Sequence, residues 1–276
     1  MMSQSRAEAL SALCTTFRRD VLQAIHDVQS GHPGGSLSVC EILSVIYLEQ
    51  AVLYPDQPER LDQDRVVLCK GHAAPMLYRI LAEKGYFPKK ELAHLRQINS
   101  LLQGHPSTHT PGIDMPSGPL GIGLAAAQGI ALGMRLNGLD NYVYAVLGDG
   151  EINEGTVWET ALSAPKFQLD HLIAVIDRNR VQLDGTMEEI MPTEPLAEKW
   201  AAFGWNVIAC DGHDVAALDA AFTLAKTNHN SPTMIIANTI KGKGVSFMEG
   251  KNTWHGAAIS DENLAQALSE LGGMTE

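Results

Sequence analysis

The stretch YVYAVLGDG, residues 142–150, decides the fold class of this chain. Residues 142–147 are apolar or aromatic and read as a buried strand, and Gly148, Asp149 and Gly150 follow directly. Ligands bind outside the carboxyl ends of strands in open parallel sheets. The glycines let the backbone turn sharply and approach a ligand closely. We therefore expect a ligand site where this strand ends, with the Asp149 carboxylate able to reach a hard cation.

The same arrangement recurs about thirty residues later. An apolar segment at residues 172–176 leads into the polar run DRNRV, residues 177–181. The ends of the two strands could bring together the Asp149 carboxylate, the Asn179 amide oxygen and a backbone carbonyl. Mg²⁺ and Ca²⁺ prefer such oxygen ligands, with water and phosphate completing the set. The alternative interpretation is that Asp149 caps a helix beginning near Ile152 and that Asn179 lies in a turn.

Strand and helix patterns alternate along the rest of the chain. Further apolar segments at residues 66–69, 205–209 and 233–237 read as strands, and periodic apolar positions predict helices at 6–29, 124–136 and 260–271. Ser36 is a plausible N-cap for another helix that runs to about Val52. This alternation predicts an α/β fold with a parallel sheet flanked by helices on both faces, in a single domain over residues 1–276.

Composition limits the kinds of partner. The chain has 276 residues with Lys+Arg 20 and Asp+Glu 32, a formal charge of −12 that disfavours general binding to nucleic acid or an anionic membrane surface. Any bound phosphate therefore needs a local site. We find no membrane-spanning run and no secretory signal, which predicts a cytoplasmic protein. The four cysteines are widely spaced and are expected to be small buried residues: Cys14, Cys40, Cys69 and Cys210.

A glycine-rich segment precedes the helix at residues 124–136. Gly121, Gly123 and Ala126 fit a dinucleotide-binding fingerprint, but that motif should follow a strand, and the three prolines in residues 111–119 argue against one. The loop instead places backbone N–H groups at a helix start, where phosphate binds. Within the helix Ala125, Gly129 and Gly133 share one face. Either close packing on the sheet or an interface between subunits would explain that face.

Several further motifs surround histidines. They are SGHPGG at residues 30–35, KGHA at 70–73, GHP at 104–106, SGPLGIG at 117–123 and WHG at 254–256. In this order, and together with GDG and the later Asn179, they resemble the amino-terminal, diphosphate-binding domain of the transketolase family. Two positions depart from the family pattern: Ile122 replaces a glutamine, and Arg180 follows the metal asparagine.

The resemblance implies a cofactor and roles for its residues. Thiamine diphosphate would be bound with Mg²⁺, for which Ca²⁺ or Mn²⁺ could substitute, and Asp149, Asn179 and Val181 would be the metal ligands. The residues implied to contact the cofactor are His72, His255, Gly118, Pro119, Leu120, Gly148, Gly150, Glu151 and Asn179. His32, His105 and His255 would face the substrate hydroxyls as proton carriers. Glu154 would meet an acid of the partner subunit near the cofactor.

The resemblance also implies an activity shared between two chains. A cofactor carbanion would carry a two-carbon ketol unit from a ketose phosphate to an aldose phosphate. In the family the pyrimidine-binding domain follows this one, and we expect a separate carboxy-terminal subunit to supply it in an α₂β₂ assembly. Two alternatives are the alpha subunit of a two-oxoacid dehydrogenase and a non-catalytic thiamine diphosphate-binding protein. Lys241 and Lys243 are expected to be solvated surface residues, with phosphate binding as the alternative.

Overall fold

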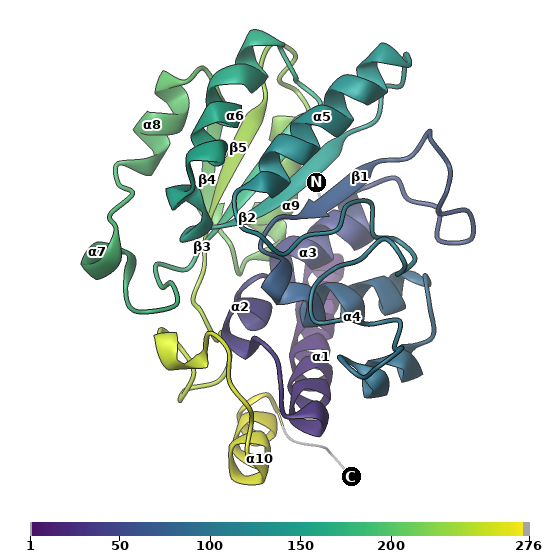
Figure 1. The fold of residues 1–276 in the computed structure, drawn as a ribbon, viewed down its shortest axis with the longest axis vertical. Helices are drawn as coiled ribbons and strands as arrows, with labels where there is room; N and C mark the ends of the chain where they lie inside the picture. Colours follow the sequence, from purple (N-terminus) through teal and green to yellow (C-terminus); the bar gives the residue numbers. More distant parts are fainter. Residues whose placement is uncertain (1, 273–276) are drawn as a thin grey trace.

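One five-stranded parallel sheet organises the protein (Figure 1). The computed structural model describes residues 2–272. The strands are β1 Arg65–Leu68, β2 Val143–Gly148, β3 Leu172–Arg178, β4 Asn206–Asp211 and β5 Thr233–Asn238, in the spatial order β1-β2-β3-β5-β4. Gly148 at the end of β2 is in register with Asp177 of β3. The carboxyl ends of the central strands therefore meet at one edge of the sheet.

Helices cover both faces of this sheet. They are α1 Gln4–Val28, α2 Pro33–Ser38, α3 Cys40–Val45, α4 Ala74–Lys84, α5 Ile122–Leu136, α6 Gly155–Lys166, α7 Met187–Ile190, α8 Leu196–Ala202, α9 Val215–Ala225 and α10 Asp261–Glu270. Shorter helical turns are η1 Ile46–Gln50, η2 Gly71–Ala73, η3 Lys89–His94, η4 Glu151–Asn153 and η5 Asn252–Trp254. The α/β class and the parallel sheet are confirmed.

The alternation of side chains along β2 separates two hydrophobic cores. Tyr144 and Val146 pack in the core shared with α1, α3, α4 and α9. Val143, Ala145 and Leu147 pack in the other core, beneath α5, α6 and α8. Successive side chains of a strand point to opposite faces, so a strand that is apolar at every position must be covered on both sides.

The edge strand β4 is confirmed to within one or two residues at its ends, and it differs from the other strands in its burial. The apolar segment expected at residues 205–209 is a strand shifted to Asn206–Asp211, and Trp205 precedes it in the core. Every residue of β4 is half-buried or exposed, because β4 lies at the edge of the sheet and pairs only with β5 among residues 2–272. The four strands predicted elsewhere are confirmed to within a residue or two at their ends.

The helix expected from Ser36 to Val52 is wrong in its details. Three shorter segments, α2, α3 and the π-helical turn η1, occupy this part of the chain. Pro33 begins α2, and Ser36 lies buried inside it instead of capping it. Val39, with φ −86° and ψ 0°, separates α2 from α3. The break turns the SGHPGG loop toward the carboxyl edge of the sheet, which a single straight helix would not do.

The small-residue face of α5 does not pack on the sheet. Ala125 and Gly129 are exposed, and a Cβ added at Gly129 or Gly133 would meet no atom within 4 Å. Gly123 makes the close approach instead, because a Cβ there would lie 2.6 Å from the Cβ of Cys69 after β1. The interpretation of this face as an interface between subunits therefore stays a prediction.

Among residues 2–272, no helix combines the length and the apolar character needed to cross a membrane.

Candidate active site at the carboxyl edge of the sheet

Asp149 joins the ends of β2 and β3. Its carboxylate accepts hydrogen bonds from the N–H of Gly150, at 2.9 Å, and from the N–H of Arg180. Arg180 adopts a positive φ of 64°, which turns its N–H toward this carboxylate. Asp149 therefore links the polar segments after the two strands, and the helix-cap alternative is not what the structure shows.

The predicted metal ligands line one cavity of about 320 Å³. Asp149, Asn179 and Val181 all border it, although the amide oxygen of Asn179 accepts a hydrogen bond from the N–H of Val181 at 3.2 Å. Burial, with a smaller contribution from the neighbouring Asp177, raises the pKa of Asp149 to about 7. A cation beside this carboxylate would favour its charged form.

Most of the predicted cofactor contacts border the same cavity. Those residues are His72, Leu120, Gly148, Gly150, Glu151, Asn179 and His255, and Glu154 borders it as well. Gly118 and Pro119 do not. A Cβ placed at Gly118 would lie 3.9 Å from the ring of His105, which puts this glycine on the histidine side of the loop.

Glu151 holds the glycine-rich loop in place. Its carboxylate accepts the N–H of Gly121 at 3.0 Å and the N–H of Gly148 at 3.1 Å. Burial raises the pKa of Glu151 to about 7 in spite of these donors. Gly121 has a φ of +89°, and a Cβ there would lie 2.6 Å from that of Glu154. Only glycine meets both demands at this position.

Glu154 stands immediately before α6. It occupies the N-cap position of α6, and its side chain makes no cap hydrogen bond. Its side chain is exposed at the edge of the cavity. This placement leaves the carboxylate open to a group outside the chain.

The four glycine-flanked histidines come together from four separate segments of the chain. The ring centroid of His32 lies 5.4 Å from that of His72, 6.1 Å from His105 and 5.6 Å from His255. The rings of His72 and His255 are 4.9 Å apart. We call these residues the histidine quartet. The sequence predicted that all four serve one site, and the structure brings them together.

The quartet is held neutral. Burial lowers the pKa of His32 to about 4 and that of His255 to about 3, with nearby cations adding to both shifts. Burial also lowers the pKa of His72 and His105 below the ordinary value. Neutral imidazoles can both accept and donate hydrogen bonds, as proton exchange with sugar hydroxyls requires.

Two lysines are buried at this edge of the sheet. The sequence analysis assigned no role to Lys70 and expected Lys241 on the surface. The Lys70 ammonium donates to Asp177 at 2.5 Å and to the carbonyl of Gly35 at 3.0 Å. Lys241 is 2 % exposed and not a solvated surface residue as expected. Its Nζ lies 2.9 Å from Nδ1 of His255 and 3.2 Å from the carbonyl of Val181. Both follow parallel strands, a position that could have indicated the site.

Lys243, by contrast, is half-buried and lies 3.8 Å from the carboxylate of Glu249. It borders neither the cavity of Asp149 nor the cavity beside His32, so it agrees with the expectation of a surface lysine.

Some buried polar atoms at this edge lack a partner within the described chain. They are His32 Nδ1, Ser36 Oγ, Ser117 Oγ and Gln182 Nε2. Buried polar groups without partners are rare in folded proteins, and an unpaired one costs about 1–3 kcal/mol. Ser117 belongs to the SGPLGIG loop, and Gln182 borders the cavity beside Asp149. A bound polar molecule would satisfy these atoms, so the residues present fit an anionic cofactor.

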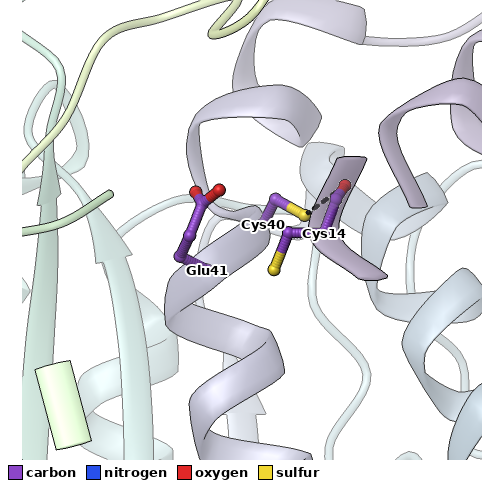
Figure 2. A group of neighbouring side chains, drawn as sticks. All are labelled: Cys14, Cys40 and Glu41. Carbon is purple, nitrogen blue, oxygen red and sulfur yellow. Dashed lines mark hydrogen bonds between the residues drawn. The ribbon is translucent and has the colours of Figure 1, made fainter. Parts of the chain in front are cut away.

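A second cluster of possible ligands lies away from this edge, between α1 and α3 (Figure 2). Ligand atoms of Cys14, Cys40 and Glu41 lie within 4.8 Å of one another. Arg18 donates to both Glu41 oxygens at 2.6 and 2.7 Å, and His213 Nδ1 lies 2.9 Å from this carboxylate. The Cys40 thiol donates to the Cys14 carbonyl. These thiols therefore act as the buried small residues that the sequence predicted.

The dinucleotide interpretation of the glycine-rich segment is wrong. No strand precedes α5 after β1 within the described chain; a long irregular stretch and α4 intervene. The loop therefore lacks the strand–turn–helix context that the fingerprint requires.

Comparison with known proteins places the chain in a family. The family described as "Transketolase, thiamine diphosphate binding domain" matches residues 10–275, and the chain belongs to it.

Two relatives match over nearly their whole length. The 6-deoxy-6-sulfo-D-fructose transketolase subunit SqwG of Clostridium sp. (strain MSTE9) is 43% identical over 98% of this chain and 98% of its own. An apulose-4-phosphate transketolase subunit of Phocaeicola vulgatus is 35% identical over 96% of this chain and 95% of its own.

Solved transketolases share the fold but are longer. A transketolase from Campylobacter jejuni aligns with a TM-score of 0.91 and 30% identity, covering 96% of this chain. This chain spans 43% of the length of that protein.

Proposed function

We propose that this chain is the diphosphate-binding subunit of a two-chain transketolase. The convergence of the histidine quartet beside the Asp149 cavity is the observation that carries the proposal. Both relatives matched over nearly their whole length are named as transketolase subunits, which supports the two-chain arrangement. The family match favours this activity over the two-oxoacid dehydrogenase alternative.

Mg²⁺ would be held by the carboxylate of Asp149, the amide oxygen of Asn179 and the carbonyl of Val181. A single protein carboxylate suits a site that a doubly anionic diphosphate completes. Burial disfavours the charge on Asp149, so the cation and this carboxylate would stabilise each other. Arg180 contributes to this site through its backbone N–H, which donates a hydrogen bond to the Asp149 carboxylate. Its side chain is exposed.

The cofactor would be held by residues of the Asp149 cavity and of the glycine-rich loop beside it. The residues proposed to contact it are His72, His255, Gly118, Pro119, Leu120, Gly148, Gly150, Glu151 and Asn179. Thiamine diphosphate, when bound, supplies the carbon nucleophile for ketol transfer. Ser117 and Gln182, whose buried polar atoms have no partner within residues 2–272, extend this set.

The protein's own part in the reaction is to orient the sugar and move protons. His32, His105 and His255 are neutral near pH 7, so His32 and His105 can each take a proton from a hydroxyl and return it, whereas His255, whose Nδ1 accepts from the Lys241 ammonium, would donate through Nε2. Lys241 contacts Nδ1 of His255 and thereby fixes the orientation of that ring. Glu154, exposed at the cavity edge, would meet the partner subunit.

The substrates would be sugars that carry an anionic group. One relative is named for a sulfonated fructose and the other for a phosphorylated apulose. Both names describe a sugar with a charged oxyanion at one carbon. We propose a ketose of this class as the donor and an aldose as the acceptor.

Reconstitution tests the proposal. The purified chain would be mixed with its partner subunit, thiamine diphosphate and Mg²⁺, and ketol transfer from a ketose phosphate would be followed by chromatography. We expect activity only in the mixture, with a mass that corresponds to α₂β₂. Full activity from this chain alone would refute the two-chain arrangement, and a mixture that oxidises a two-oxoacid instead would refute the reaction.

A further inference from the structure

His213 connects the buried Arg18–Glu41 pair to the segment that follows β5. Its Nδ1 atom lies 2.9 Å from the carboxylate of Glu41, and its Nε2 accepts a hydrogen bond from the N–H of Ile240 at 2.8 Å. A ring nitrogen that accepts an N–H carries no proton, so the proton of this ring is on Nδ1 and is donated to Glu41. The two contacts together fix the tautomer and the orientation of the His213 ring.

The carboxylate that orients His213 is itself held in the core. Arg18 of α1 donates to both oxygens of Glu41 in α3, at 2.6 and 2.7 Å, and to the carbonyl of Leu37 in α2 at 3.0 Å. Burial raises the pKa of Glu41, but Arg18 and His213 together hold it below its ordinary value. Glu41 is therefore a charged acceptor whose place is set by three helices.

Ile240 is the residue before Lys241, and the backbone is held at both positions. The N–H of Ile240 donates to His213, and the carbonyl of Lys241 accepts the N–H of Gly250 at 2.9 Å. From this backbone the Lys241 side chain brings Nζ to 2.9 Å from Nδ1 of His255. The position of this buried ammonium therefore depends on the hydrogen bond that His213 accepts.

We propose that His213 is a positioning residue of the proposed transketolase reaction, on which this inference rests. It holds the backbone at Ile240 and thereby the ammonium of Lys241. That ammonium donates to Nδ1 of His255, which keeps the proton of the neutral ring on Nε2. His213 borders neither the cavity of Asp149 nor the cavity beside His32, so it acts only through these residues.

A double-mutant cycle in the reconstituted enzyme tests this series of contacts. His213→Leu removes both hydrogen bonds of the ring, while Glu41 keeps the two from Arg18. With a ketose phosphate donor we expect kcat to fall about tenfold and KM to change less than about threefold, because a displaced proton donor slows the chemical step more than it weakens binding. In a Lys241→Met background the same substitution should change kcat less than about twofold, because the residue through which His213 acts is gone.

Two further variants separate positioning from a general loss of packing. His213→Gln keeps one donor and one acceptor and should restore part of kcat. His171→Leu is the matched control. His171 is half-buried and lies 3.5 Å from the carboxylate of Asp140, but it precedes β3 at the opposite end of the sheet. Its removal should leave kcat and KM unchanged.

NMR of the chain alone gives a readout that does not depend on activity. Spectra that correlate ring protons with the ring nitrogens of isotope-labelled histidine report which nitrogen is protonated. We expect the proton of His213 on Nδ1 and that of His255 on Nε2. In His213→Leu the ring of His255 should become a mixture of both tautomers.

Three outcomes would overturn the inference. An equal fractional loss of kcat in the wild-type and Lys241→Met backgrounds would show that His213 has a structural role. An unchanged kcat in His213→Leu would show that the reaction does not need the contact with Ile240. A proton on Nε2 of His213 would contradict the hydrogen bonds from which the inference starts.

Failure of the proposed activity would be recognised separately, because the wild-type complex would then transfer nothing from any donor. The NMR comparison would still decide whether His213 controls His255. Loss of the single tautomer of His255 in His213→Leu would support the link, and an unchanged ring would refute it.

Discussion

At the residue scale, the site depends on neutral histidines beside buried charges. The pKa of His32 lies at about 4 because the ring is buried near cationic groups, so the ring stays neutral through physiological pH. The histidines could be selected from the sequence because each adjoins glycine in an irregular segment. Lys70 and Lys241 were not selected, although both follow parallel strands, because the sequence gives no sign of whether a lysine ammonium will be buried.

His32→Ala should separate catalysis from cofactor binding. His32 does not border the Asp149 cavity, so thiamine diphosphate affinity should change little. Turnover should fall about 10²- to 10⁴-fold, the usual contribution of a positioned acid–base group. Steady-state kinetics and a cofactor titration of the reconstituted enzyme measure the two effects. Unchanged turnover would show that the SGHPGG loop has another role.

Lys70→Met should destabilise the fold itself. The Lys70–Asp177 pair is almost fully buried, and the carboxylate also accepts the hydroxyls of Ser38 and Thr239. Burial raises the pKa of Asp177, but Lys70 and these hydroxyls together hold it below its usual value. Removing the lysine leaves the buried Asp177 carboxylate without its cationic partner. The free energy of unfolding, measured with denaturant, should fall by about 3–5 kcal/mol.

The double variant Lys70→Met/Asp177→Leu is the control for that measurement. Once both charges are gone it should recover much of the lost stability, because buried pairs can often be replaced by apolar groups. A single variant as stable as the wild type would contradict this account of the pair.

At the element scale, strands were easier to predict than helix breaks. The three inner strands, β2, β3 and β5, are almost uniformly apolar, and uniform burial leaves little ambiguity about their place in the sheet. The division of the segment after Pro33 was missed because the apolar residues of α2 and α3 continue across Val39 with helical spacing. Backbone dihedral angles, not composition, mark that break.

Two glycines of the α5 region should respond oppositely to alanine. Gly121→Ala places an alanine at a φ of +89° with its Cβ 2.6 Å from that of Glu154. Both are unfavourable, so this variant should unfold at a lower denaturant concentration than the wild type. Gly129→Ala meets no atom within 4 Å inside a helix and should stabilise the isolated chain by about 1 kcal/mol. Equal effects would contradict the packing described for this helix.

The same helix tests the predicted interface between subunits. Gly129→Leu adds bulk to the exposed small-residue face of α5 and should lower the assembled fraction in sedimentation while the chain stays folded. An unchanged assembly would place the interface elsewhere.

The contact between α1 and α10 should depend on pH. Hydrogen bonds to Asp261, at 2.8 Å, and to Asp27 raise the pKa of His26 above 6.5. The protonated ring is favoured in the folded state, so its stabilising effect is complete below pH 6.5 and disappears as the pH rises through the higher folded value. The thermal midpoint of the wild type should exceed that of His26→Gln at pH 5.5 and match it at pH 8.5. A difference independent of pH would refute this.

At the scale of the whole molecule, one edge of the sheet collects residues from along most of the chain. Motifs from residue 30 to residue 256 meet there because parallel strands end on the same side. The order of the motifs predicted a set of site residues, and most of those expected to contact the cofactor border the Asp149 cavity. It did not predict that His32 would border a second cavity while His72 and His255 border the cavity of Asp149, since that depends on how loops far apart in sequence pack together.

The measurement that tests the account most directly is calorimetric titration of thiamine diphosphate into the reconstituted complex. With Mg²⁺ and the wild-type chain we expect tight binding. Excess chelator, or Asp149→Ala in this chain, should weaken it more than about tenfold, because a charged ligand contributes at least about 1.5 kcal/mol. Binding that stays tight in chelator and in Asp149→Ala would contradict the claim that this edge of the sheet holds the cofactor through a metal ion.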